Sequence, residues 1–271
     1  MEHATPFVLL LIALFIGPVL YFIWHAKRGS TLFVRRIPGI DAIDEAIGRS
    51  VELGRPMAFT TGLTDISPEL YACLGVLRHV SQKAAIYRSK LLVPSTVAES
   101  MVLADATIQS AYRSQRRFSD YDPRSVRFLS TDQFAFASGY MGLVHREQVA
   151  GAFLFGRFAA ESLILAEAGQ QIGAIQVAAT ISNEQIPFFI TTCDYTLIGE
   201  ELFAAGAYLS KNPVQTGSLR GQDIAKLIIV VLIVVGILQA TISAVQGGEP
   251  HAALGDWFSV SWSELLSSSG K

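Results

Sequence analysis

The chain has few cysteines and lacks the glycine-rich motifs of the common nucleotide-binding sites. Its two cysteines, Cys73 and Cys193, lie far apart and form no CxxC pair, so neither a zinc site nor a disulfide framework is indicated. No GxGxxG motif follows the first expected strand, where residues 60–65 read TTGLTD, and no GxxxxGK(S/T) motif occurs. A conventional dinucleotide site or P-loop is therefore not expected.

The central part of the chain also lacks a recognisable catalytic set. His79 and His145 are its only histidines. The sequence brings neither of them near Cys193, so this cysteine has no evident base to activate it. The net charge of -2 does not favour a nucleic-acid partner. We predict no catalytic residue, no metal site and no cofactor, and the sequence favours a protein without enzymatic activity.

Two apolar runs near the ends of the chain are its most informative feature. Phe7–Trp24 and Leu227–Val245 contain no charged side chain, and each is long enough for a helix to cross a bilayer core of about 30 Å. A cleaved signal peptide is the alternative for the first run. However, no basic segment precedes that run and no small-x-small cleavage site follows it. We predict transmembrane helices within residues 1–25 and 223–246.

Basic residues flank both runs on the side of the central region. Four follow the first run and three precede the second, whereas the tail has three acids and one lysine. The positive-inside rule then places residues 26–222 in the cytoplasm and both termini outside, in a bacterial inner membrane. The tail, residues 247–271, contains an amphipathic stretch at 254–266 that fits either the membrane surface or a docking partner.

Strand-like and helix-like segments alternate through the central region. A juxtamembrane helix is expected at 40–53. Strands are expected at 57–60, 89–93, 126–129, 151–155, 172–178 and 187–191. Helices are expected at 67–85, 95–116, 131–142, 159–168 and 196–209, followed by a loop at 211–222. This order predicts an α/β fold, a mostly parallel Rossmann-like sheet with helices on both faces, flanked by the two transmembrane helices.

Several short segments of the chain are similar to those of a known family. They read RIP at 36–38, DAIDEA at 41–46, GRP at 54–56, DQFA at 132–135, ESLILAE at 161–167, CDYT at 193–196 and GSLRGQD at 217–223. Together they resemble an uncharacterised family of bacterial membrane proteins with a domain of unknown function. The resemblance implies membrane helices that flank an α/β domain. It implies no activity and assigns no catalytic residue.

Polar residues follow several expected strands, where ligands bind in open parallel sheets. Hydroxyl and carboxylate groups at such positions, together with helix N-termini, can hold a phosphate or a carboxylate. The same residue types are also the usual helix caps, which gives a purely structural alternative. The expected caps are Ser67 before Pro68, Ser95 or Thr96, and Thr131 or Asp132. The candidate ligand-binding residues are Thr61, Asp65, Ser95, Thr131, Asp132, Cys193 and Asp194.

These observations favour a membrane-anchored scaffold or assembly protein without catalytic activity. It would self-associate or dock on other subunits of a larger membrane complex, so its expected partners are the lipid bilayer, copies of itself or other membrane proteins. The alternative is a sensor or enzyme that binds a small anion or a nucleotide at the carboxyl ends of the strands.

Overall fold

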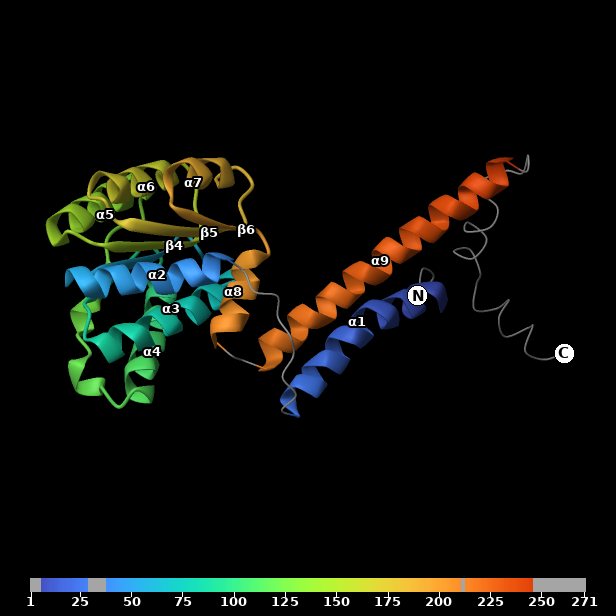
Figure 1. Cartoon of the computed structure of the whole chain (residues 1–271), viewed down its shortest axis with the longest axis horizontal. Coiled ribbons are helices and arrows are strands. Elements are labelled where there is room, and N and C mark those ends of the chain that lie inside the picture. Colours follow the sequence, from blue (N-terminus) through green and yellow to red (C-terminus); the bar gives the residue numbers. More distant parts are fainter. Residues whose placement is uncertain (1–5, 29–37, 211–212, 246–271) are drawn as a thin grey trace. The chain divides into compact units, whose positions relative to one another are not determined.

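The computed structural model describes residues 6–28, 38–210 and 213–245 (Figure 1). The chain forms two compact units. One contains Val34–Lys211, and the other combines Met1–Phe33 with Asn212–Lys271. The amphipathic stretch expected at residues 254–266 lies outside the described residues.

A six-stranded parallel sheet forms the centre of the larger unit. Its strands are β1 (Met57–Gly62), β2 (Leu91–Ser95), β3 (Val126–Phe128), β4 (Gly151–Arg157), β5 (Ile175–Thr180) and β6 (Tyr195–Ile198). They lie in the order β3-β2-β1-β4-β5-β6, and every neighbouring pair is parallel. This confirms the predicted α/β class and parallel sheet. The strand order reverses between β1 and β4, which is the topological switch point of such a sheet.

Helices cover both faces of the sheet (Figure 1). One face packs against α2 (Pro38–Leu53), α3 (Pro68–Tyr87), α4 (Ala98–Ser114) and α8 (Glu201–Ser210), and the other against α5 (Gln133–Glu147), α6 (Glu161–Gln171) and α7 (Ile186–Thr192). Two short 3-10 helices, Phe118–Asp120 and Pro123–Ser125, precede β3.

Alternate residues of each strand enter the two cores. Phe153 and Phe155 of β4 are buried with α2, α3 and α8, whereas Leu154 is buried with α5, α6 and α7. Side chains on a strand point alternately to opposite faces, so a strand covered by helices on both sides must be apolar throughout. This explains why these strands appear in the sequence as short continuous apolar runs.

Local capping signals placed two helices correctly. Ser67 is the N-cap of α3 and its hydroxyl oxygen accepts a hydrogen bond from the Leu70 amide at 3.3 Å, with Pro68 at the first helical position. Asp132 is the N-cap of α5. The expected cap of α4 by Ser95 or Thr96 is wrong. Val97 is the N-cap there, and the Thr96 hydroxyl instead donates to the Gly62 carbonyl at 2.5 Å.

The expected strand at residues 187–191 is also wrong. Ile186–Thr192 forms helix α7, the sixth strand is Tyr195–Ile198, and α8 begins at Glu201 rather than near Thr196. A short apolar run does not by itself distinguish a strand from a buried helical turn. Tertiary packing favours the helix here. Phe189 is fully buried, and its ring packs edge-on against the ring of Phe158 with 5.2 Å between the ring centroids.

The smaller unit pairs α1 (Pro6–Lys27) with α9 (Pro213–Val245). The expected loop at 211–222 is thus helical from Pro213 onward. Gly217 faces Ile23, and a Cβ on Gly217 would lie 2.7 Å from the Ile23 Cα, while Gly221 faces Val19. The helices therefore run antiparallel, and glycines in a GxxxG spacing allow their backbones to approach closely. Leu227, where the uncharged run of α9 begins, lies beyond both glycines. The contact therefore leaves this run offset along the helix pair from the apolar run of α1.

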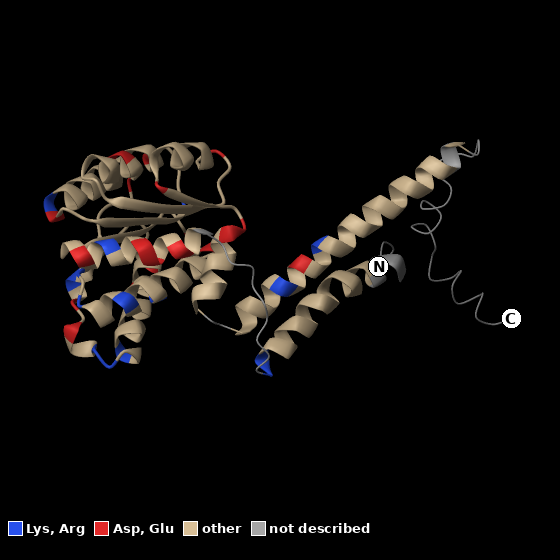
Figure 2. Cartoon of the chain, in the orientation of Figure 1, with Lys and Arg blue, Asp and Glu red and all other residues tan. Residues whose placement is uncertain are grey.

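Among the described residues, one helical segment, Pro213–Ile242, is long and apolar enough to cross a membrane. No residue of its most apolar window is buried, unlike a core helix of a globular domain. Figure 2 shows that the charged residues of α9 are confined to its first half. The apolar part of α1 is shorter, Leu11–Lys27.

Candidate functional site

Hydrogen bonds join the ends of β1 and β4 at the switch point. The Leu63 amide donates to the Arg157 carbonyl at 2.8 Å, and the Arg157 amide donates to the Thr64 hydroxyl at 2.7 Å. Gly156 has a φ of +134°, and a Cβ there would lie 2.5 Å from the Thr61 carbonyl oxygen. The loop after β1 is therefore held close against β4.

A cavity of about 350 Å³ lies beside this junction. The loop after β1 and the first turn of α3 form one wall of this cavity. The rest of the lining comes from Arg157 at the end of β4, Ile181 just after β5 and Phe203 of α8. Its volume is at the lower end of the range of small-molecule pockets, about 300–1,000 Å³. Its lining residues are Thr64, Asp65, Ser67, Pro68, Glu69, Arg157, Ile181 and Phe203.

Glu69 is the unusual residue of this cavity. It is only 5% exposed, and within the described part of the chain its Oε1 atom has no hydrogen-bond partner. Burial raises the pKa of Glu69 above its ordinary value of 4.5, and the positive charge of Arg157 partly offsets that rise. Buried polar atoms are nearly always paired in native proteins, so an unpaired carboxylate oxygen in a cavity wall points to a ligand.

Arg157 supplies the opposite charge. Its side chain is 60% exposed, and its Nη2 atom lies 3.7 Å from the Asp65 carboxylate. The cavity thus combines a buried acid with an exposed guanidinium group. Ile181 and Phe203 give it an apolar side.

One of the residues proposed from the sequence lines this cavity, and a second is hydrogen-bonded to a lining residue. Asp65 lines the cavity, and Thr61 is buried at the end of β1, where its carbonyl accepts a hydrogen bond from the Thr64 hydroxyl at 2.5 Å. Sequence reasoning missed Glu69, Arg157, Ile181 and Phe203. Glu69 gave a weak signal, since an acid in the first turn of a helix is expected for electrostatic reasons alone.

Ser95 ends β2, Thr131 and Asp132 follow β3, and none of the three lines the cavity. The Ser95 hydroxyl donates to the Val97 carbonyl at 3.1 Å. The Asp132 carboxylate accepts from the Phe134 and Ala135 amides at 3.1 and 2.8 Å. Ser95 thus serves the local turn and Asp132 caps its helix, while Thr131 is exposed.

Cys193 and Asp194 lie at the opposite end of the sheet, which corrects their expected position. They precede β6 instead of following a strand, and the Asp194 carboxylate accepts from the Gln176 amide, near the start of β5, at 2.7 Å. Cys193 is 9% exposed, and burial raises the pKa of its thiol to about 12. A thiol in that environment is protonated at neutral pH and is not a nucleophile.

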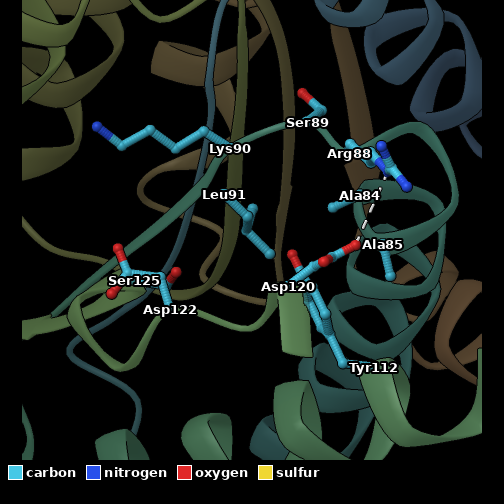
Figure 3. Close-up of a pocket in the computed structure, with 10 residues that line it drawn as sticks. All are labelled: Ala84, Ala85, Arg88, Ser89, Lys90, Leu91, Tyr112, Asp120, Asp122 and Ser125. Atoms are coloured by element: carbon cyan, nitrogen blue, oxygen red, sulfur yellow. Dashed lines mark ion pairs between the residues drawn. The ribbon is translucent and has the colours of Figure 1, made fainter. Parts of the chain in front are cut away.

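A second hollow, of about 220 Å³, lies at the amino end of β2 (Figure 3). Its charged groups are at the surface, where Arg88 Nε lies 3.9 Å from Asp120 Oδ2, and Lys90 points away from that pair in Figure 3. Among the described residues, none of the buried unpaired side-chain atoms lines this hollow. The cavity that contains Glu69 is therefore the stronger candidate.

The described residues hold no group of three or more His, Cys, Asp or Glu side chains that could bind a metal ion.

Comparisons with known proteins identify a family. Residues 1–250 match a family described as a domain of unknown function, DUF6754. No curated protein and no solved structure matches the chain. The match confirms the expected resemblance to an uncharacterised family, while a bacterial membrane origin stays a prediction.

Proposed function

The chain belongs to the DUF6754 family, and we propose that it is a membrane-anchored binding protein whose α/β unit takes up a small polar molecule beside the switch point of its sheet. This is the alternative that the sequence left open, with the site moved to a cavity that the sequence did not reveal.

The unpaired Oε1 atom of Glu69 carries this proposal. Leaving a buried acceptor without a partner costs about 1–3 kcal/mol, and more for a charged group. A ligand that donates a hydrogen bond to Glu69 would recover part of that cost. Unexplained costs of this kind are concentrated at functional sites in natural proteins.

Thermal unfolding of the detergent-solubilised full chain with a panel of nucleotides, sugars, amino acids and carboxylates tests the proposal. A ligand at 100 times its Kd should stabilise the folded chain by about 2.7 kcal/mol. Ile181→Trp, which fills the cavity, should abolish the shift. Val102→Trp is the matched control, because Val102 is exposed on α4 and does not line the cavity. A panel without effect would contradict the proposal, as would an equal shift in the Ile181→Trp variant.

The membrane anchor is part of the same proposal and is supported by α9. Leu227–Val245 has no charged side chain, and a helix of this length spans about 28 Å at about 1.5 Å per residue. A second crossing by α1 would require α1 to slide along α9, because the contacts at Gly217 and Gly221 stagger the two apolar runs. The proposed arrangement, with the α/β unit in the cytoplasm and both termini outside, includes this shift of α1, because both helices must then cross the membrane.

Two membrane experiments test the anchor. Alkaline carbonate should leave the chain in the vesicles, and protease added to sealed, right-side-out cells should spare the α/β unit. Release by carbonate would refute the anchor, and cleavage within residues 38–210 would refute the orientation.

An assembly role is the second candidate, and the outer surface of α5, α6 and α7 favours it. Phe134, Leu163, Phe188 and Ile190 are exposed there, each from 43 to 56%. Exposed apolar side chains that gather on one layer are typical of protein contacts. Blue-native electrophoresis of mildly solubilised membranes should then show a species larger than the monomer, and Phe188→Ser with Ile190→Ser should reduce it. A monomer alone would count against this role.

A further inference from the structure

We infer that the cavity beside β1 and β4 selects a zwitterionic small molecule, whose ammonium group meets Glu69 and whose carboxylate meets Arg157. This inference rests on the proposed binding function and specifies its ligand.

Among the residues that line the cavity, Glu69 offers an acceptor. An ionised carboxylate only accepts hydrogen bonds, and an ammonium group only donates them, so the two are complementary. The neighbouring hydroxyl groups are already engaged: Thr64 donates to the Thr61 carbonyl and accepts from the Arg157 amide, and the Ser67 oxygen accepts from the Leu70 amide. Glu69 is the lining residue with a buried oxygen that remains unpaired within the described residues.

The rim of the cavity offers a donor. Arg157 and Asp65 are 3.7 Å apart and both exposed, and an exposed ion pair of this kind contributes little. A ligand carboxylate can form the shorter, two-pronged pair that a guanidinium group favours. Glu69 and Arg157 both line this one cavity of about 350 Å³, so one small molecule can meet both charges.

The structure argues against a nucleotide as the occupant. Pro68 has no amide hydrogen, and the Leu70 amide is bound by Ser67, so the N-terminus of α3 presents few donors to a phosphate. The Glu69 carboxylate would also repel it. Ile181 and Phe203 instead suit the hydrocarbon part of an amino acid.

The test uses the full chain in detergent and three matched sets of probes. The zwitterions are glycine, 4-aminobutyrate, 6-aminohexanoate, L-leucine and L-phenylalanine. Butyrate and hexanoate lack the ammonium group, and butylamine and hexylamine lack the carboxylate. Titration calorimetry and saturation-transfer NMR measure binding. We expect one zwitterion to bind about tenfold or more tightly than the probes that lack one charge.

Two charge-removing variants assign the two ends. Glu69→Gln should weaken binding of the zwitterion about tenfold and leave binding of the carboxylate probes within about twofold. Arg157→Gln should weaken the zwitterion and the carboxylates alike. Arg88→Gln, in the hollow at the other end of the sheet, is the control and should change the binding of neither the zwitterion nor the carboxylates.

The outcomes separate this inference from the function on which it rests. A nucleotide or a plain carboxylate could instead bind, with binding abolished by Ile181→Trp but unaffected by Glu69→Gln. That result would overturn the proposed selectivity for a zwitterion and preserve the proposed binding function. Absence of binding by every probe here and in the wider panel would overturn both. Circular dichroism of each variant confirms that it is folded, and Ile181→Trp tests the site without altering Glu69.

Discussion

Gly75 of α3 lies against Gly206 of α8. A Cβ on Gly75 would lie 2.8 Å from the Gly206 carbonyl oxygen, and a Cβ on Gly206 would lie 2.6 Å from the Ala72 carbonyl oxygen. The two helices therefore touch through their backbones. Since α3 carries Glu69 and α8 carries Phe203, this contact holds two of the elements that line the cavity close together.

Gly206→Val should destabilise the α/β unit, because added atoms would force α3 and α8 apart. Overpacking of this kind costs about 1–3 kcal/mol. Gly48→Ala is the control, since nothing lies within 4 Å of a Cβ at that helical position. It should be neutral or stabilise by up to about 1 kcal/mol. Urea unfolding followed by circular dichroism measures both, and equal stabilities would contradict the close contact.

Asp132→Ala should cost about 0.5–2 kcal/mol, because the Phe134 and Ala135 amides would lose their acceptor. Asp132→Ser should retain most of that stability, since serine is also a good cap. Thr131→Ala, at an exposed neighbouring position, should stay within about 0.5 kcal/mol of the parent. The same unfolding assay decides, and an unchanged Asp132→Ala variant would be inconsistent with the capping role.

Glu69→Gln should stabilise the chain without ligand at neutral pH. Burial raises the folded-state pKa of Glu69 above 4.5, so the folded protein retains the proton over a range where the unfolded chain has lost it. Stability therefore falls as pH rises through that range. The advantage of the glutamine variant should grow across the same range and disappear at lower pH, where both forms are neutral. Unfolding curves between pH 4 and 8 test this.

Glu147→Gln should show the opposite dependence of folding stability on pH in the same series of unfolding curves. A hydrogen bond from Lys90 Nζ, 2.6 Å away, is the main reason why the pKa of Glu147 lies below 4.5. This carboxylate stabilises the folded chain above the unfolded pKa and loses that effect as pH falls through the folded pKa. The loss on mutation should be below about 1 kcal/mol, because the pair is near the surface. A parallel response of both variants to pH would refute the assignment.

Both cysteines should resist thiol reagents in the folded protein. Cys73 is fully buried, and burial raises the pKa of each thiol, that of Cys193 to about 12. Ellman's reagent at pH 8 should give little colour from the native chain and two equivalents in denaturant. Thr131→Cys, at an exposed position, should add one rapidly reacting thiol. Rapid reaction of Cys193 in the native chain would contradict the conclusion that its thiol is not a nucleophile.

The fold could be predicted where the relevant signal was local. Ser67 followed by Pro68, and Asp132 before an apolar stretch, marked two helix starts because a cap needs only its neighbouring amides. The short apolar strands indicated a parallel sheet because burial on both faces removes alternation. The prediction failed at Ile186–Thr192, where packing of Phe189 against Phe158 selected a helix.

By itself, the sequence determined the α/β class and the parallel sheet, since both follow from short-range patterns of apolar residues, caps and turns. Tertiary structure alone decided which chemical groups meet. It moved Cys193 and Asp194 to the amino end of the sheet, and it placed Glu69 in one cavity with Arg157, 88 positions later in the chain (157 − 69). That cavity depends on strand order and on the close approach of α3 and α8, which arise from contacts between residues distant in sequence and leave no periodic signal.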